Sequence, residues 1–301
     1  MVAYDSKAVD VRFLPSLSRC FSPVVLGDLI SRGKSDYLTE IVHNSGIGAI
    51  LDLSGRLRDF FDGLYDYLFR CYRSEYIYKN ILAQQVYLGR HAQTSHMLTE
   101  LRVASCKADV VVLNGTSTVY EIKSDLDSFD RLDSQISAYT NFFDNIYVVT
   151  SARRIEEVAK VLGQDIGIMA LSEDGAVDTL RESGSHKAQV NPAIIFGTLR
   201  KHEYTWIIKE TFGSVPDVPN TRLHDACLRL FKQLSSAQAH DAMMMSLQRR
   251  SNPRQLRSFF DAAPHSLKAC ATSVRFAMRD AQTFTELLDG RAQLAASPVH
   301  D

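Results

Sequence analysis

Two runs rich in β-branched residues flank an Asn-Gly pair, and this pattern constrains the fold more than any other in the chain. The runs cover residues 107–113 (KADVVVL) and 117–123 (STVYEIK). Val, Ile, Thr and Tyr favour strands, and Asn114-Gly115 tolerates the positive φ angles of a tight hairpin turn. The sequence therefore predicts two antiparallel strands that are neighbours in one sheet.

The periodicity of apolar residues predicts further elements on both sides of this hairpin. Helical spacing predicts helices from Glu75 to about Gly89 with Ser74 as N-cap, over 126–143 and over 152–162. Apolar runs predict strands over 97–103, 145–150 and 166–171. Strands and helices that alternate in this way indicate an α/β core.

The chain is long enough for more than one domain, with 301 residues of which 45% are hydrophobic. Residues 1–72 read as a helical N-terminal segment that ends in an amphipathic helix over 57–72. Residues 73–196 hold the α/β core. Residues 197–301 form a helical C-terminal domain, with helices expected over 222–234, 239–248, 253–262 and 265–278.

Composition excludes several classes of protein. The five cysteines are scattered and form no C-x-x-C pair, so neither a disulfide framework nor a zinc ribbon is expected. Without a secretory leader or an apolar run of about 18 residues, we expect a cytoplasmic protein with no membrane partner. The net charge of -1 argues against a globally basic nucleic-acid binder, because phosphate contacts need Lys and Arg. Any nucleic-acid surface must therefore be local.

The hairpin carries three charged residues whose chemistry suits phosphodiester hydrolysis. Side chains alternate along a strand, so Glu121 and Lys123 share one face while Ile122 points to the other. Asp109 on the adjacent strand can lie on the same face. Converging charges are costly to bury unless they are paired or hold a cation. Carboxylates suit Mg²⁺, and the lysine can position or help deprotonate a water or donate to phosphate.

These residues resemble the motif of the PD-(D/E)XK, or restriction-endonuclease-like, nuclease superfamily. Asp109 matches the aspartate of its second core strand, and Glu121-Ile122-Lys123 matches the (D/E)XK of its third. The resemblance implies an αβββαβ core and a Mg²⁺ or Mn²⁺ ion held by Asp109, Glu121 and the carbonyl of Ile122. It also implies a catalytic Lys123 beside the nucleophilic water. Ala108 stands where the motif has proline.

The helix after the hairpin adds a second motif. Gln135 and Tyr139 are four residues apart and hence on one face, and they resemble the Q-x-x-x-Y element of RecB-like exonucleases. In that element the residues orient the lysine and contact DNA. The fold usually has one more catalytic acidic residue on its first helix, which Glu75 matches, and Glu100 competes for that role. Glu75 could instead be only an acidic residue in the first turn of a helix, where the helix dipole favours it, with Lys79 as its ion-pair partner one turn later.

The wider string from EYIYKN to FFDNIYVVT is similar to an uncharacterised bacterial and phage family within this superfamily, over residues 73–150. The expected function is a metal-dependent deoxyribonuclease, with a role in phage defence, restriction or repair left open. The alternative is a catalytically inactive nuclease-like module that binds nucleic acid or a partner protein. A DNA-reading transcription factor is a third reading, but no helix-turn-helix pattern supports it. The C-terminal domain is the candidate surface for a homodimer or a partner protein.

Overall fold

A computed structural model describes residues 9–89, 95–250, 253–270, 278–292 and 294. The chain divides into two compact units, one made of Met1–Arg90 with Arg254–Asp301 and the other of His91–Pro253. The sequence predicted three consecutive segments with boundaries near residues 72 and 196. The units differ from that expectation in two ways. The last helices of the chain belong with the first, and residues 75–88, which were expected in the α/β core, belong to the first unit.

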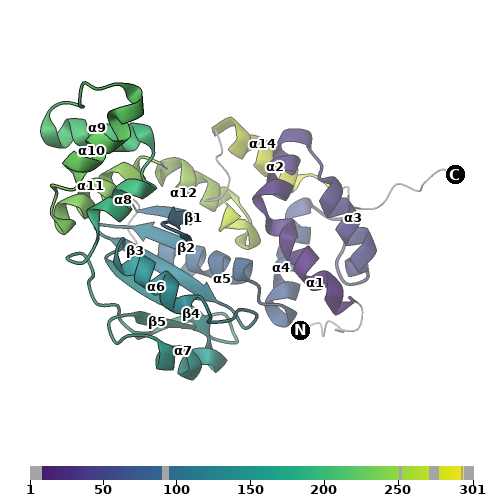
Figure 1. Ribbon diagram of the computed structural model, residues 1–301. Coiled ribbons are helices and arrows are strands. Elements are labelled where there is room, and N and C mark those ends of the chain that lie inside the picture. Colours follow the sequence, from purple (N-terminus) through teal and green to yellow (C-terminus); the bar gives the residue numbers. More distant parts are fainter. Residues whose placement is uncertain (1–8, 90–94, 251–252, 271–277, 293, 295–301) are drawn as a thin grey trace. The chain divides into compact units, whose positions relative to one another are not determined.

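The first unit is helical. Its elements are η1 (Val11–Phe13), α1 (Leu14–Ser18), η2 (Arg19–Phe21), α2 (Pro23–Arg32), α3 (Asp36–Ser45), η3 (Ile47–Ala49), α4 (Leu57–Cys71), α5 (Glu75–Ile81), η4 (Leu82–Leu88), α12 (Pro253–Ala262), η6 (His265–Leu267) and α14 (Met278–Asp289) (Figure 1). The expected amphipathic helix is confirmed as α4, which buries Phe60, Phe61, Leu64 and Leu68. That apolar stripe supplies much of the core.

Buried polar contacts join the C-terminal turn η6 to helix α5 within this unit. The Asn80 side chain donates to the carbonyl of His265 and accepts from the amide of Ala269. The Tyr76 hydroxyl donates to the carbonyl of Ser266. These bonds cross about 190 positions of sequence, so no local pattern could predict them.

The N-cap position at Ser74 is confirmed, but the Ser74 side chain makes no cap hydrogen bond, and its hydroxyl instead pairs with that of Ser18 at 2.7 Å. One expectation for this unit needs correction. The helix expected from residue 265 begins as the 3-10 turn η6, because Pro264 precedes it and Asp62 holds the amide of Ser266. Part of that expected helix, residues 271–277, lies outside the described residues.

His265 gives the first unit a pH-dependent contact. Its Nδ1 lies 3.1 Å from Asp62 and its Nε2 lies 3.2 Å from Asp66. The bond to Asp62 raises the pKa of His265 above 6.5. A histidine with a raised folded-state pKa adds stability that is complete below pH 6.5 and is lost as pH rises through the raised pKa.

We expect an NMR titration to show the pKa of His265 above 6.5 in the wild-type chain. Asp62→Asn should bring it back toward that value, because the main charged partner is gone. The pH dependence of the unfolding free energy should weaken in the same variant. A wild-type pKa at or below 6.5 would contradict this account.

The second unit is built on a six-stranded mixed sheet with the strand order β1 to β6. The strands are β1 (His96–Val103), β2 (Cys106–Leu113), β3 (Ser117–Lys123), β4 (Asn145–Ser151), β5 (Gly167–Leu171) and β6 (Val177–Arg181). Strands β1, β2 and β3 are antiparallel, β3, β4 and β5 are parallel, and β6 returns antiparallel to β5. The α/β class is therefore confirmed, and so is the hairpin at Asn114-Gly115, where Gly115 has a φ of 70°.

Helices complete this unit. α6 (Leu132–Thr140) and α7 (Ile155–Val161) connect the parallel strands, and η5 (Ala152–Arg154) precedes α7. Four more helices, α8 (Pro192–Thr198), α9 (Lys201–Phe212), α10 (Asn220–Phe231) and α11 (Ser236–Gln248), gather at one end of the unit (Figure 1). The sequence missed β6, α8 and α9. β6 is a short edge strand that buries only Val177, so its apolar pattern is weak.

Helix α6 begins six residues later than the sequence indicated. Residues 124–131 form a loop because Asp127 accepts from both the amide and the hydroxyl of Ser124, at 2.8 and 2.6 Å. Such side-chain bonds to nearby backbone compete with helix formation. The tyrosine of α6 nevertheless keeps the expected inward position, since Tyr139 is fully buried.

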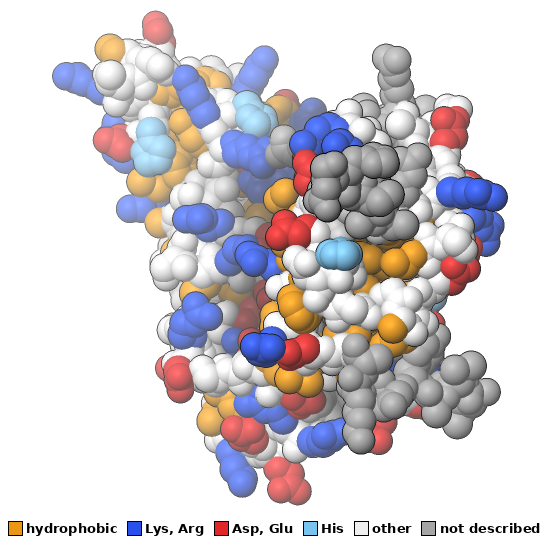
Figure 2. All heavy atoms as spheres, turned by 90° about the vertical axis from the view of Figure 1, so that its right-hand side faces the viewer, with side chains coloured by type: hydrophobic (Ala, Val, Ile, Leu, Met, Phe, Trp, Pro, Cys, Tyr) orange, Lys and Arg blue, Asp and Glu red, His pale blue; other side chains and the backbone are white. Residues whose placement is uncertain are grey.

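Surface character agrees with the balanced composition. Acidic and basic side chains are interspersed over the face drawn in Figure 2. Among the described residues, no single helix has both the length and the apolar composition to cross a membrane, although the bent pair Val11–Phe21 and Pro23–Arg32 reaches that length together.

Candidate active site

The site is centred where the backbone pairing of β2 and β3 ends. The register runs from Leu113 opposite Ser117 to Val110 opposite Tyr120. Beyond that point the Asp109 carboxylate takes the place of a main-chain partner, and its Oδ2 accepts from the amide of Ile122 at 2.8 Å. The aspartate predicted on the second strand is therefore fixed directly to the E-I-K segment of the third.

Glu121 and Lys123 lie in a buried polar network with helix α6. The Lys123 ammonium donates to the side-chain carbonyl of Gln135 (Nζ to Oε1, 2.8 Å) and lies 3.1 Å from Oε1 of Glu121. The Gln135 amide donates to that same Glu121 oxygen at 2.5 Å, and the Tyr139 hydroxyl donates to the other at 2.8 Å. The structure thus joins four of the side chains that the two sequence motifs singled out.

Burial makes this network electrostatically unusual. Glu121 is 1% exposed and Lys123 is 5% exposed. Burial raises the pKa of Glu121 above its ordinary value, while the positive charge of Lys123 and the bonds from Tyr139 and Gln135 oppose that rise. Burial and the Glu121 charge also raise the pKa of the Tyr139 hydroxyl, so Tyr139 stays a hydrogen-bond donor at neutral pH.

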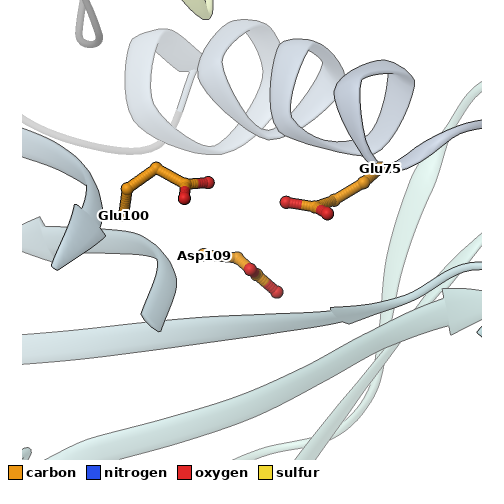
Figure 3. Close-up of side chains that lie close together, drawn as sticks. All are labelled: Glu75, Glu100 and Asp109. Atoms are coloured by element: carbon orange, nitrogen blue, oxygen red, sulfur yellow. The ribbon is translucent and has the colours of Figure 1, made fainter. Parts of the chain in front are cut away.

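The same unit places a further carboxylate beside Asp109. Figure 3 shows Glu100 and Asp109 on neighbouring strands β1 and β2, and a carboxylate oxygen of each lies within 4.8 Å of the other. Glu100 adopts a φ of 59°, in the left-handed region that a residue with a Cβ rarely occupies. Its carboxylate also forms an ion pair with Lys107. The sequence ranked Glu100 below Glu75, because the resemblance implies an acidic residue on the first helix and Glu100 was expected on the first strand.

Glu75, also labelled in Figure 3, belongs to the first unit. It lies in the first turn of α5, its side chain is half-exposed, and it forms an ion pair with Lys79 one turn later. This pair is the plainer role that the sequence left open for Glu75. A ligand role for Glu75 remains a prediction.

The arrangement can do three things chemically. Carboxylate oxygens of Asp109 and Glu100 lie within 4.8 Å of each other, and such hard donors suit a divalent cation such as Mg²⁺. The ammonium of Lys123 is held at a fixed point by two acceptors, so it can donate to an anionic group. Gln135 and Tyr139 donate to the two carboxylate oxygens of Glu121, which limits its side-chain freedom.

Comparisons with known proteins place the chain in a family. Residues 70–269 match the family model for bacteriophage P4 protein cII. Protein cII of Enterobacteria phage P4 is 25% identical over 177 residues, a match that covers 57% of this chain and 66% of that protein, just under two thirds of its length. Among solved structures, the SPO1766 protein of unknown function from Silicibacter pomeroyi is 19% identical, with a TM-score of 0.28 over 41% of this chain and 85% of that one. Because the family model spans more than half of the sequence, the chain belongs to the bacteriophage P4 protein cII family.

Proposed function

We propose that this protein is a metal-dependent nuclease that hydrolyses phosphodiester bonds in DNA, with a restriction-endonuclease-like αβββαβ core. The order α5, β1, β2, β3, α6, β4 supports that core. The observation that carries the proposal is the buried network of Glu121, Lys123, Gln135 and Tyr139, with Asp109 bonded to the adjoining amide.

The energetic cost of this network argues for a chemical role. A lysine and a glutamate removed from water lose several kcal/mol of hydration each, and an apolar pair of similar volume is often as stable or more stable. A sheet that needed only to fold would gain little from such residues. Their place at the end of a strand pairing, beside Asp109, supports a role in acting on a ligand.

The donor set fits a hard divalent cation. Asp109 and Glu121 would hold Mg²⁺ or Mn²⁺ together with the carbonyl of Ile122, and a third carboxylate would come from Glu100 or Glu75. When bound, such an ion lowers the pKa of a water and offsets negative charge on the phosphate. The protein contributes the remaining parts: Lys123 donates to a phosphate oxygen or orients the water, and Gln135 fixes the direction of its ammonium.

Nucleic acid is the proposed partner, and its contacts would be local because the net charge of the chain is -1. DNA is proposed as the substrate because the site residues resemble the motif of nucleases that cleave DNA. We also propose that the C-terminal helices contact a second copy of the chain or another protein.

The test is a cleavage assay of the purified full chain on linear, circular and single-stranded DNA and on RNA, with Mg²⁺, Mn²⁺ or a chelator. We expect cleavage of DNA with metal and none with chelator. Asp109→Asn should lower the rate by about 10²-fold or more, because it removes a charged group from the reacting centre. Asp178→Asn, an exposed aspartate on edge strand β6, is the matched control and should keep the wild-type rate.

The same assay separates the two candidates for the third carboxylate. A loss in Glu100→Gln with normal activity in Glu75→Gln assigns the role to Glu100, and the reverse pattern assigns it to Glu75. Binding of DNA without cleavage under every metal would overturn the nuclease and favour a nucleic-acid-binding module.

A further inference from the structure

The loop between β3 and α6 is held by an arginine from a distant part of the second unit. Arg154, the last residue of η5, donates through Nη1 to the carbonyls of Ser124 and Asp127, at 2.5 and 2.7 Å. Its guanidinium carbon lies 4.0 Å from the ring centroid of Phe129, and its Nε lies 3.2 Å from Glu157. One side chain thus contacts the loop at three positions.

Two aspartates of the loop also form hydrogen bonds that hold it in place. Asp127 accepts from Ser124, which directly follows Lys123. Asp125 accepts from the Ser151 hydroxyl at the end of β4. With these bonds and Arg154, the loop has a defined path from the end of β3 to the start of α6.

The path of the loop sets the distance between Lys123 on β3 and Gln135 on α6. Lys123 lies at the end of β3 and Gln135 lies in the first turn of α6, and the 2.8 Å bond between them depends on how the intervening loop closes. A displacement of about 1 Å at a reacting group can cost about 10²-fold in rate. Fixing the loop therefore fixes where the ammonium of Lys123 points.

We propose that Arg154 is a positioning residue of the proposed active site, acting through residues 124–131 on the Lys123 and Gln135 pair. This inference rests on the proposed function. A guanidinium suits the role because its planar donors can serve two carbonyls and a carboxylate while its face stacks on an aromatic ring. A lysine ammonium cannot make all of these contacts together.

Arg153 provides a matched control one residue away. Its side chain is 75% exposed and pairs with the exposed Glu173. Removing it changes the local charge by the same amount but leaves the loop contacts intact.

The experiment compares Arg154→Ala, Arg154→Lys and Arg153→Ala in the full chain, by steady-state cleavage and by hydrogen exchange. We expect Arg154→Ala to lower kcat by about 10²-fold, with KM within about twofold of wild type. The kcat of Arg154→Lys should lie between those of Arg154→Ala and wild type, and the kcat of Arg153→Ala should equal that of wild type. An unchanged kcat in Arg154→Ala, or a change confined to KM, would overturn the proposal, and Arg154→Lys keeps it testable if the alanine variant fails to fold.

Hydrogen exchange separates this inference from the nuclease proposal. In Arg154→Ala the amides of Ser124, Asp127 and Leu132, which are bonded within the loop, should exchange faster than in wild type and in Arg153→Ala. If wild type cleaves no substrate, the proposed function fails while this comparison still decides the placement of Arg154. Equal exchange in all three proteins would reject the role assigned to Arg154.

Discussion

Lys123→Ala should abolish metal-dependent cleavage, with a fall in kcat of about 10²- to 10⁴-fold. This is the range that a single positioned acid, base or donor contributes. The variant should still fold, because Gln135 and Tyr139 continue to bind the Glu121 carboxylate. Burial already raises the pKa of that carboxyl, so it can take up a proton once the ammonium is lost.

The control for this prediction is Lys160→Ala, which removes an exposed lysine of α7 in the same unit. It should cleave at the wild-type rate. Lys123→Met adds a variant that fills the volume of the lost side chain without its charge, and it should be as inactive as Lys123→Ala. Wild-type activity in either Lys123 variant would show that the ammonium has no part in the reaction.

Phe143→Ala should lower the free energy of unfolding of the second unit by about 3 to 5 kcal/mol, the usual cost of deleting a buried phenyl ring. Phe143 is fully buried, three residues after the end of α6. Its ring packs edge-on against Tyr139 and Phe142, with centroids 5.8 and 4.7 Å away. The cavity would therefore open behind the tyrosine that binds Glu121.

Urea unfolding followed by hydrogen exchange can assign this loss to the second unit. Phe212→Ala is the matched control, because Phe212 is 36% exposed at the end of α9 and its loss should cost less than about 1 kcal/mol. A Phe143→Ala variant no less stable than Phe212→Ala would show that this cluster is not part of the cooperative core.

Part of the polar network could be found from local geometry, and the rest followed from the resemblance to known nuclease motifs. The period of two along a strand puts Glu121 and Lys123 on one face, and a spacing of four on a helix aligns Gln135 with Tyr139. The Asn-Gly turn makes the Asp109 strand the neighbour of the Glu121 strand. These short-range rules predicted which side chains share a face, and the resemblance to the Q-x-x-x-Y element implied that Gln135 and Tyr139 lie at Lys123.

The third carboxylate could not be ranked in the same way. Glu100 lies beside Asp109 only because β1 pairs with β2 and turns through a residue with positive φ. That conformation is unusual for glutamate, and no neighbouring residue type predicts it. The ion pair between Glu75 and Lys79, by contrast, follows from helical spacing and was expected.

By itself the sequence determined the hairpin, the α/β class and the shared face of Glu121 and Lys123, since strand and helix periodicity act over a few residues. Tertiary structure decided the rest: the pairing of the first helices with the last, and the contacts of Arg154 with the loop before α6. These features join segments far apart in the chain, and long-range packing selects such contacts only after the local elements exist.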